Sequence, residues 1–280
     1  MERNKILVLG SKGMLGGQLM EVFGSEAVGW DRSEADVMQV ESLKLKVESL
    51  KPSIIINCVA YNDVDGAEDN RELAFLLNSQ VPKNLSEIAN ACTSTLVHFS
   101  TNYVFDGEKG EYGETDGAHP LSVYGQSKAE GEKQIIISCK KYYIIRTAVL
   151  FGPKGQSELS KKSFVNLMLE LSQKTDTIKA VSTEVNSITY TKDLAQMVKV
   201  LLFQNSPYGI YHLTNSGQAS WYDYAKEIFA ITKKSINLIP VSRSEFPRKA
   251  KTPQKAVLIN TKLPNLRPWQ EALREFLTTS

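Results

Sequence analysis

The chain has 280 residues, which is enough for one large domain or two modest domains with a sizeable core. Lysine plus arginine number 33 and aspartate plus glutamate 31, so the near-neutral charge argues against nucleic acid or an acidic membrane surface as the main partner. No apolar run is long enough to span a bilayer and no signal peptide is visible, so we expect a cytoplasmic protein. Three cysteines and three histidines show no metal-type spacing, and we therefore expect free thiols and no metal site.

Short apolar runs alternate with helical patterns through the first half of the chain. Leu15, Leu19 and Phe23, for example, repeat at helical spacing directly after a continuous apolar run. Strands are expected at residues 5–9, 26–30, 54–59, 95–99 and 142–146. A glycine-rich loop is expected at residues 106–117. This alternation predicts an α/β fold with a Rossmann-type, doubly wound parallel sheet, and we assign residues 1–150 to a dinucleotide-binding domain.

The pattern loosens after Phe151. Thr191 is a plausible N-cap for a helix that includes Leu194 and Val198, and residues 210–213 form one more candidate strand. Ser220 and Asp223 have the spacing of a capping box, and Pro268 is expected to start a final helix. We assign residues 151–280 mainly to a smaller, mixed substrate-binding region, with a return to the first domain around 189–212.

Gly10, Gly13 and Gly16 lie between the first strand and the first helix, with the spacing G-x-x-G-x-x-G. Such a loop lets the backbone pass close to a pyrophosphate, and the helix N-terminus supplies N–H groups. Asp31 follows Gly10 by 21 residues, where a carboxylate accepts from a ribose hydroxyl in NAD binding. Arg32 could instead meet the 2′-phosphate of NADP. The expected cofactor is therefore NADPH or NADH, and both alternatives stay open.

Tyr124 and Lys128 are four residues apart in a segment with the pattern of an early helix, so they share a face. An ammonium beside a phenol favours the phenolate and lowers the phenol's pKa, which permits proton exchange near neutral pH. Thr101 stands at the carboxyl end of the fourth strand, the edge that lines the ligand crevice of open α/β sheets. We expect Thr101 to donate a hydrogen bond to a carbonyl group, Tyr124 to protonate it, and Lys128 to hold the nicotinamide ribose.

These residues resemble the extended short-chain dehydrogenases/reductases, and more specifically the dTDP-4-dehydrorhamnose reductases. Residues 57–65 resemble the segment N-x-A-A-Y-T-x-V-D, residues 100–107 resemble S-T-D-Y-V-F-D-G, and residues 120–128 match P-x-x-x-Y-G-x-S-K. Residues 211–213, with 220–221, resemble a later signature, so the resemblance covers nearly the whole chain. It implies NAD(P)H-dependent reduction of a 4-keto-6-deoxy sugar nucleotide in dTDP-L-rhamnose biosynthesis. A nucleotide-diphosphate sugar is then the expected substrate, and a homodimer is a possible assembly.

The resemblance also implies a set of site residues, which we carry over position by position. The catalytic residues are Thr101, Tyr124 and Lys128. The cofactor-binding residues are Gly10, Lys12, Gly13, Met14, Leu15, Gly16, Asp31, Arg32, Asp36, Val37, Cys58, Ala60, Tyr61, Tyr124 and Lys128. The substrate-binding residues are Val64, Tyr103, Val149 and Lys251, with Tyr61 beside the sugar. The cations available for the diphosphate are Lys154, Arg243, Arg248 and Lys251.

The sequence departs from the family pattern mainly where the sugar should bind. Asn102 replaces an aspartate, Val149 a tryptophan and Ile188 a proline, while residues 182–184 and 250–253 also differ. The cofactor and proton residues are intact, so the departures leave the identity of the sugar open. Dehydratases of the superfamily carry Asp-Glu after the threonine, and Asn102-Tyr103 cannot supply that acid and base. Two alternatives remain: an NADP-binding regulatory subunit akin to that of methionine adenosyltransferase, and a sugar-nucleotide epimerase, which uses the same three side chains.

Overall fold

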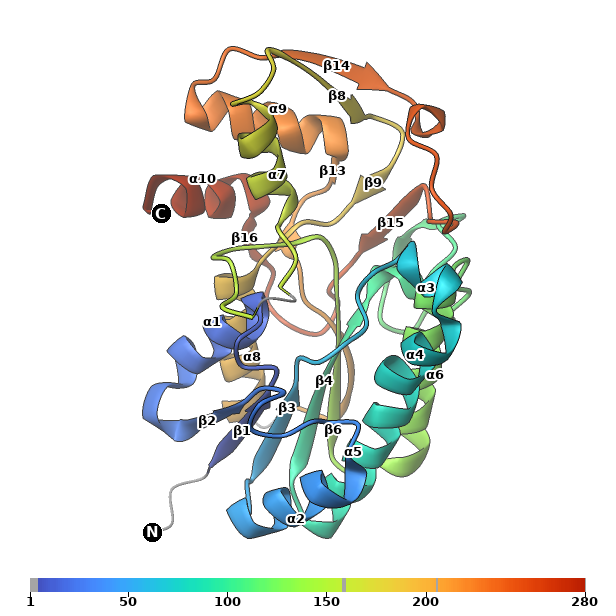
Figure 1. The fold of residues 1–280 in the computed structure, drawn as a ribbon, viewed down its shortest axis with the longest axis vertical. Helices are drawn as coiled ribbons and strands as arrows, with labels where there is room; N and C mark the ends of the chain where they lie inside the picture. The colour runs from blue at the N-terminus through green and yellow to red at the C-terminus, as the bar shows by residue number, and fades with distance from the viewer. Residues whose placement is uncertain (1–4, 158–159, 205, 280) are drawn as a thin grey trace.

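A computed structural model of the chain describes residues 5–157, 160–204 and 206–279. Its centre is a six-stranded parallel sheet with the strand order β11-β6-β4-β3-β1-β2 (Figure 1). The strands are β1 (Ile6–Leu9), β2 (Ala27–Trp30), β3 (Ile54–Asn57), β4 (Thr95–Thr101), β6 (Tyr142–Thr147) and β11 (Gly209–His212). From β1 the chain passes to β2 on one side and then to β3 on the other. The carboxyl ends of β1 and β3 therefore form a topological switch point, where open α/β sheets bind ligands.

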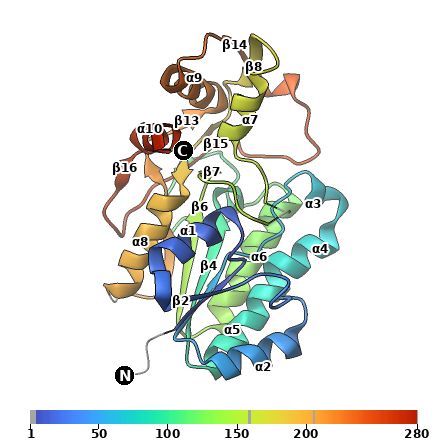
Figure 2. The ribbon, with the colours of Figure 1, turned by 60° about the vertical axis from the view of Figure 1, so that its left-hand side comes forward.

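Helices cover both faces of this sheet, as Figure 2 shows. One face carries α1 (Met14–Phe23) and α8 (Thr191–Phe203), and the other carries α2 (Val40–Leu50), α5 (Val81–Ala91) and α6 (Val123–Ser138). Alternate residues of one strand serve the two cores: Ile6 and Val8 pack toward α1 and α8, whereas Leu7 and Leu9 pack toward α2 and α5. The fold is thus the Rossmann-type, doubly wound sheet that the alternation of strands and helices predicts.

Short elements connect the larger ones. The chain passes from β3 to α5 through α3 (Gly66–Asp69), α4 (Arg71–Phe75) and the π-helical turn η2 (Leu76–Gln80). The remaining short turns are the 3-10 helices η1 (Gly24–Glu26), η3 (Asn102–Val104) and η4 (Arg243–Glu245).

A second layer of smaller sheets and three helices stands above the carboxyl end of the central sheet (Figure 1). A four-stranded sheet has the order β13 (Ala219–Ser220), β9 (Val185–Asn186), β15 (Lys255–Leu258) and β5 (Gly110–Tyr112). The two-stranded pairs are β7 (Leu150–Phe151) with β10 (Thr189–Tyr190), β8 (Thr177–Val181) with β14 (Asn237–Val241), and β12 (Asn215–Ser216) with β16 (Leu266–Pro268). Helices α7 (Phe164–Leu171), α9 (Trp221–Thr232) and α10 (Trp269–Thr279) share an aromatic core with the first two of these pairs.

Three local expectations need correction. Residues 106–117 are not only a loop, because β5 forms there and pairs in parallel with β15, far along the chain. Thr191 is the first residue of α8 rather than its N-cap, which is Tyr190. Pro268 ends β16, and α10 begins one residue later. The capping box of Ser220 is confirmed: its hydroxyl accepts from the Asp223 N–H and its own N–H donates to the Asp223 carboxylate.

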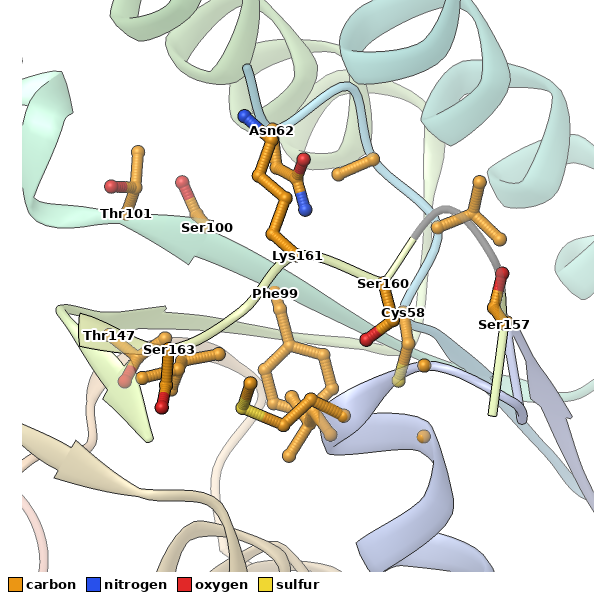
Figure 3. Close-up of a pocket in the computed structure, with 18 of the residues that line it drawn as sticks. Cys58, Asn62, Phe99, Ser100, Thr101, Thr147, Ser157, Ser160, Lys161 and Ser163 are labelled. Atoms are coloured by element: carbon orange, nitrogen blue, oxygen red, sulfur yellow. The ribbon is translucent and has the colours of Figure 1, made fainter. Parts of the chain in front are cut away.

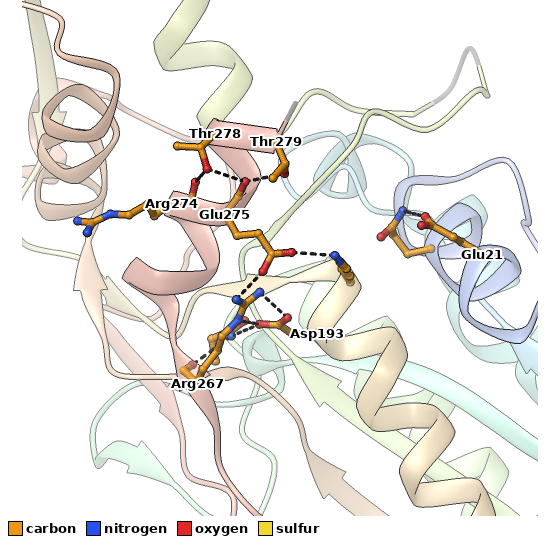
Figure 4. Close-up of polar contacts among 10 residues, drawn as sticks. Glu21, Asp193, Arg267, Arg274, Glu275, Thr278 and Thr279 are labelled. Atoms are coloured by element: carbon orange, nitrogen blue, oxygen red, sulfur yellow. Dashed lines mark hydrogen bonds and ion pairs between the residues drawn. The ribbon is translucent and has the colours of Figure 1, made fainter.

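Charged contacts tie the two layers together around Arg267 (Figure 4). Its guanidinium lies 2.8 Å from the carboxylate of Asp193 on α8 and 2.6 Å from that of Glu275 on α10. Lys192 adds a second contact to Glu275 at 2.8 Å, and Asp193 is buried. This network fixes α10 against the sheet-covering helix α8.

The assignment of residues 1–150 and 151–280 to separate domains stays a prediction. No helix in the described ranges has the length and apolar character needed to cross a membrane.

Candidate active site

A cavity of about 430 Å³ opens at the switch point, beyond the carboxyl ends of β1, β3 and β4. Its lining includes residues from the first turn of α1, from the segment after β3 and from α6. The predicted site residues that line it are Gly10, Gly13, Met14, Leu15, Gly16, Asp31, Cys58, Ala60, Thr101, Tyr124, Lys128 and Val149. The parallel topology thus gathers most of the residues singled out in the sequence into one space.

Within the glycine loop, backbone segments lie so close together that a side chain would clash. Gly10 has a φ of +76°, which favours glycine, and a Cβ on Gly16 would lie 2.1 Å from the Gly10 carbonyl oxygen. Gly13 immediately precedes α1, and no side chain in the described ranges caps this helix N-terminus. The bare backbone and the first-turn N–H groups beside the cavity form a cradle that fits a pyrophosphate. A dinucleotide is therefore compatible with the residues present here.

Acidic groups cluster at the end of β2. Asp31 lines the cavity, and its N–H donates to the Glu34 carboxylate at 2.9 Å. This hydrogen bond, with one from Ser33, lowers the pKa of Glu34 to about 2. Lys12 turns away from the lining toward Glu34, with Nζ 3.4 Å from Oε1. The side chain of Arg32 is 70% exposed and lies 3.6 Å from the Asp36 carboxylate.

The other predicted cofactor and substrate residues lie outside the cavity lining. Val37 is buried in the core near α2, while Tyr61 packs in the small apolar cluster that contains Tyr124. Tyr103 meets Tyr124 edge-on, with ring centroids 6.0 Å apart. Val64 is partly buried and Lys251 is exposed. The binding roles of all these residues stay predictions.

The start of α6 sets the position of Tyr124. Ser122 caps the helix by accepting from the Gly125 N–H at 3.1 Å. Gly125 packs directly on η3: a Cβ there would lie 2.2 Å from the carbonyl oxygen of Tyr103. The Tyr124 phenol and the Thr101 side chain both line the cavity beside this contact. Thr101 and Tyr124 are therefore positioned in one cavity, as is needed if both are to contact the oxygen of one carbonyl group.

The phenol of Tyr124 does not have the lowered pKa that its spacing from Lys128 predicts. Burial raises the pKa of Tyr124 to about 12, and the hydrogen bond with Thr101 only partly opposes this rise. The expectation of an easily formed phenolate is wrong for this arrangement. A phenol that keeps its proton at neutral pH is instead suited to donate it.

Lys128 extends past Tyr124 into the sheet. Its Nζ donates to the carbonyl oxygen of Phe99 at 2.6 Å and lies 3.2 Å from Nε2 of His98. Burial lowers the pKa of Lys128 to about 8, and the nearby Glu132 carboxylate opposes this shift. The Lys128 side chain is thus held on β4, so sharing a helical face does not by itself make it a partner of the phenol.

Sequence reasoning missed a further part of the lining. Ser100 and Thr101 lie side by side at the end of β4, and Lys161 and Asn62 approach from other segments (Figure 3). The Ser100 Oγ atom is buried and has no hydrogen-bond partner among the described residues, so it is a free polar group at the cavity. The other missed residues are Val59, Phe99, Thr147, Ala148, Leu150, Ser157, Ser160, Lys162 and Ser163. Ser100 stood beside Thr101 in the strand-end motif, whereas in the segment after β7 the sequence pointed to Lys154, which does not line the cavity.

Two of the predicted diphosphate cations are already paired within the protein. Arg243 lies 3.0 Å from the buried Glu184 carboxylate, and its guanidinium also donates to the carbonyl oxygens of Thr252 and Ala250. Arg248 lies 3.0 Å from the Asp65 carboxylate. Both arginines therefore shape the layer above the cavity. Lys161 brings a positive charge to the cavity lining, and its Nζ lies 3.1 Å from the Asp63 carboxylate.

Asn102, the residue that replaces the family's aspartate, has a structural task. Its Nδ2 donates to the Asn186 side chain and to the Ala256 carbonyl oxygen, both at 2.9 Å. It therefore ties the end of β4 to β9 and β15. It does not line the cavity.

Comparison with known proteins gives full-length matches. The family model described as RmlD substrate binding domain matches residues 4–280. A dTDP-4-dehydrorhamnose reductase of Aggregatibacter actinomycetemcomitans is 35% identical, over 96% of this chain and 97% of that protein. The crystal structure of a dTDP-4-dehydrorhamnose reductase from Clostridium acetobutylicum is 36% identical with a TM-score of 0.92, covering 98% of this chain and 99% of the other. That of a dTDP-4-dehydrorhamnose reductase from Bacillus anthracis in complex with NADP is 31% identical with a TM-score of 0.94, covering 99% and 100%.

Proposed function

The chain belongs to the RmlD substrate binding domain family, and we propose that it reduces the 4-keto group of a dTDP-4-keto-6-deoxy sugar with NADPH or NADH. The observation that carries this proposal is that Thr101 and Tyr124 line the same cavity as the glycine loop. Hydride transfer from a nicotinamide to a carbonyl group needs a proton donor next to the site that holds the dinucleotide.

The chain's own residues would divide the work as follows. Gly10, Gly13 and Gly16 would carry the pyrophosphate, and Asp31 would accept from the adenosine ribose. When bound, the nicotinamide supplies the hydride. Thr101 would hold the substrate's carbonyl oxygen by donating a hydrogen bond.

Tyr124 would give its phenolic proton to the oxygen that becomes the alcohol. The raised pKa of Tyr124 supports this role, because the phenol remains protonated at neutral pH. Lys128, as an ammonium, would hold the nicotinamide ribose at the base of the cavity. The Ser100 hydroxyl, which has no hydrogen-bond partner among the described residues, would be available to a polar group of either ligand.

Reaction in the cytoplasm is part of the same proposal. Cys58, Cys92 and Cys139 are free thiols, which agrees with a reducing compartment. A homodimer stays a prediction.

The test is nicotinamide oxidation, followed at 340 nm, with enzymatically generated dTDP-4-keto-6-deoxy sugar and with NADPH and NADH in parallel. The expected result is stoichiometric conversion of the keto sugar and the nicotinamide, with the reduced sugar identified by NMR. Cofactor binding without consumption would support the regulatory-subunit alternative, and interconversion of sugar epimers without net consumption would support the epimerase.

A further inference from the structure

The neighbours of Lys128 on the central sheet define a hydrogen-bonded chain that the proposed reaction does not yet use. Asn57 and His98 are register partners on β3 and β4, and both side chains are buried. Asn57 Nδ2 lies 3.1 Å from His98 Nδ1, and His98 Nε2 lies 3.2 Å from Lys128 Nζ. The three side chains therefore form a line from the sheet to the cavity.

The direction of each hydrogen bond in this line follows from Asn57. Its Oδ1 accepts from the Val59 N–H at 3.0 Å, so its amide NH₂ must face His98. An NH₂ group is only a donor, so His98 Nδ1 must be the acceptor and cannot carry a proton. Burial and the neighbouring Lys128 lower the pKa of His98 well below its usual value, so the ring is neutral. A neutral ring without a proton on Nδ1 carries it on Nε2, and this N–H points at Lys128.

An ammonium has three N–H donors and no acceptor, whereas a neutral amine has a lone pair. Lys128 Nζ already donates to the Phe99 carbonyl oxygen. It can also accept from His98 Nε2–H only as the neutral amine. We propose that His98, oriented by Asn57, is a positioning residue that draws Lys128 onto β4 and favours its neutral amine over its ammonium.

This inference rests on the proposed function for its consequence, because the ammonium is the form that would anchor the ribose. The other charged groups near Lys128 act in the opposite sense or are neutralised. Glu132 favours the ammonium, but it is itself held in a buried pair with Arg146 of β6, at 2.6 Å. Tyr124, one turn earlier on α6, remains a neutral phenol. His98 is thus the side-chain contact that, in addition to burial, penalises the charged lysine, and it lowers the upper pH limit of the reaction.

The first test is NMR of the full chain with ¹⁵N-labelled histidine, whose nitrogen shifts distinguish the two tautomers. The chain has three histidines, so the spectrum is simple to assign with His98→Gln. His98 is expected to carry its proton on Nε2. His212 is an internal reference of the opposite kind, because its Nδ1 lies 3.1 Å from the carbonyl oxygens of both Tyr112 and Ile259 and must donate. A proton on Nδ1 of His98 would overturn the proposal.

The second test is titration of the Lys128 side chain by ¹³C NMR of labelled lysine, with the resonance assigned by its loss in Lys128→Gln. His98→Gln replaces the N–H with an amide whose oxygen can turn to accept from the ammonium. The titration is expected to move up by at least one pH unit, a tenfold change in proton affinity. His119→Gln, at an exposed histidine, is the matched control and should leave the titration unchanged.

A titration that stays in place in folded His98→Gln would contradict the proposal. If that variant does not fold, Asn57→Asp replaces it: the carboxylate accepts from Nδ1–H, so the His98 tautomer should reverse and the Lys128 titration should rise. An unreversed tautomer would equally refute the argument. Both NMR readings need no turnover, so they separate this inference from failure of the proposed function. If the protein turns over substrate, the pH at which kcat/KM declines on the alkaline side should rise in His98→Gln by as many pH units as the Lys128 titration does.

Discussion

Adding one methyl group to the glycine loop should weaken cofactor binding while the protein still folds. In Gly16→Ala the new Cβ would lie 2.1 Å from the Gly10 carbonyl oxygen and 2.9 Å from Ser11 Cα. The contact is to backbone, so no side chain can move aside, and the loop itself must shift by about 1 Å. Overpacking of this kind costs roughly 1–3 kcal/mol. If that cost falls on the loop conformation that binds the pyrophosphate, affinity drops roughly fivefold to more than a hundredfold.

The neighbouring glycine provides the matched control. A Cβ on Gly17 would have only the Ser11 carbonyl oxygen within reach, at 3.9 Å, which is an ordinary contact. Gly17→Ala should therefore bind NADPH as the wild type does and gain up to about 1 kcal/mol of stability from its helical position. The assays are a fluorescence titration of NADPH and thermal unfolding of both variants. Unchanged affinity in Gly16→Ala, or equal loss in Gly17→Ala, would refute the role given to this loop.

Three further predictions concern cofactor choice, stability and pH. Asp31→Ala should weaken NADH more than NADPH, by roughly tenfold, because a charged hydrogen bond to the ribose is lost; equal loss for both cofactors in binding titrations would contradict this. Arg267→Gln should lower the free energy of unfolding by about 3 kcal/mol in urea titrations, because the buried Asp193 carboxylate loses its ion-pair partner. A change under about 0.5 kcal/mol, which is usual for surface substitutions, would show that this network does not stabilise the fold. The value of kcat/KM should fall as the pH rises through about 8, because the lowered pKa of Lys128 means that the ammonium loses its proton there, and a flat profile to pH 10 would oppose that role.

Local sequence signals predict most of the central sheet. Continuous apolar runs such as Ile6–Leu9, followed by helical repeats, identify parallel strands because both faces of such strands are buried. The glycine loop is recognisable because strand, turn and helix occur in order. In contrast, β5 is three residues long and lies in a glycine-rich stretch. Its partner is β15, far along the chain, so no local pattern marks it.

The chemical detail of the site depended on contacts that spacing does not show. Tyr124 and Lys128 share a helical face, but the lysine side chain is long enough to reach the acceptors on β4 instead. His98 has the pattern of a core strand residue, and only its register with Asn57 shows that its ring is oriented. Similarly, Asn102 looked like a lost acidic group, whereas its amide joins three strands.

The central claim is that Tyr124 donates the proton in a reduction, and single-turnover kinetics of Tyr124→Phe test it most directly. The substitution removes only the hydroxyl and keeps the edge-on contact with the Tyr103 ring. With excess enzyme, NADPH and the dTDP-4-keto sugar, the account predicts wild-type binding of both ligands and a hydride-transfer rate lowered at least about 100-fold, as for loss of a general acid. A rate within a few-fold of the wild type would contradict the account.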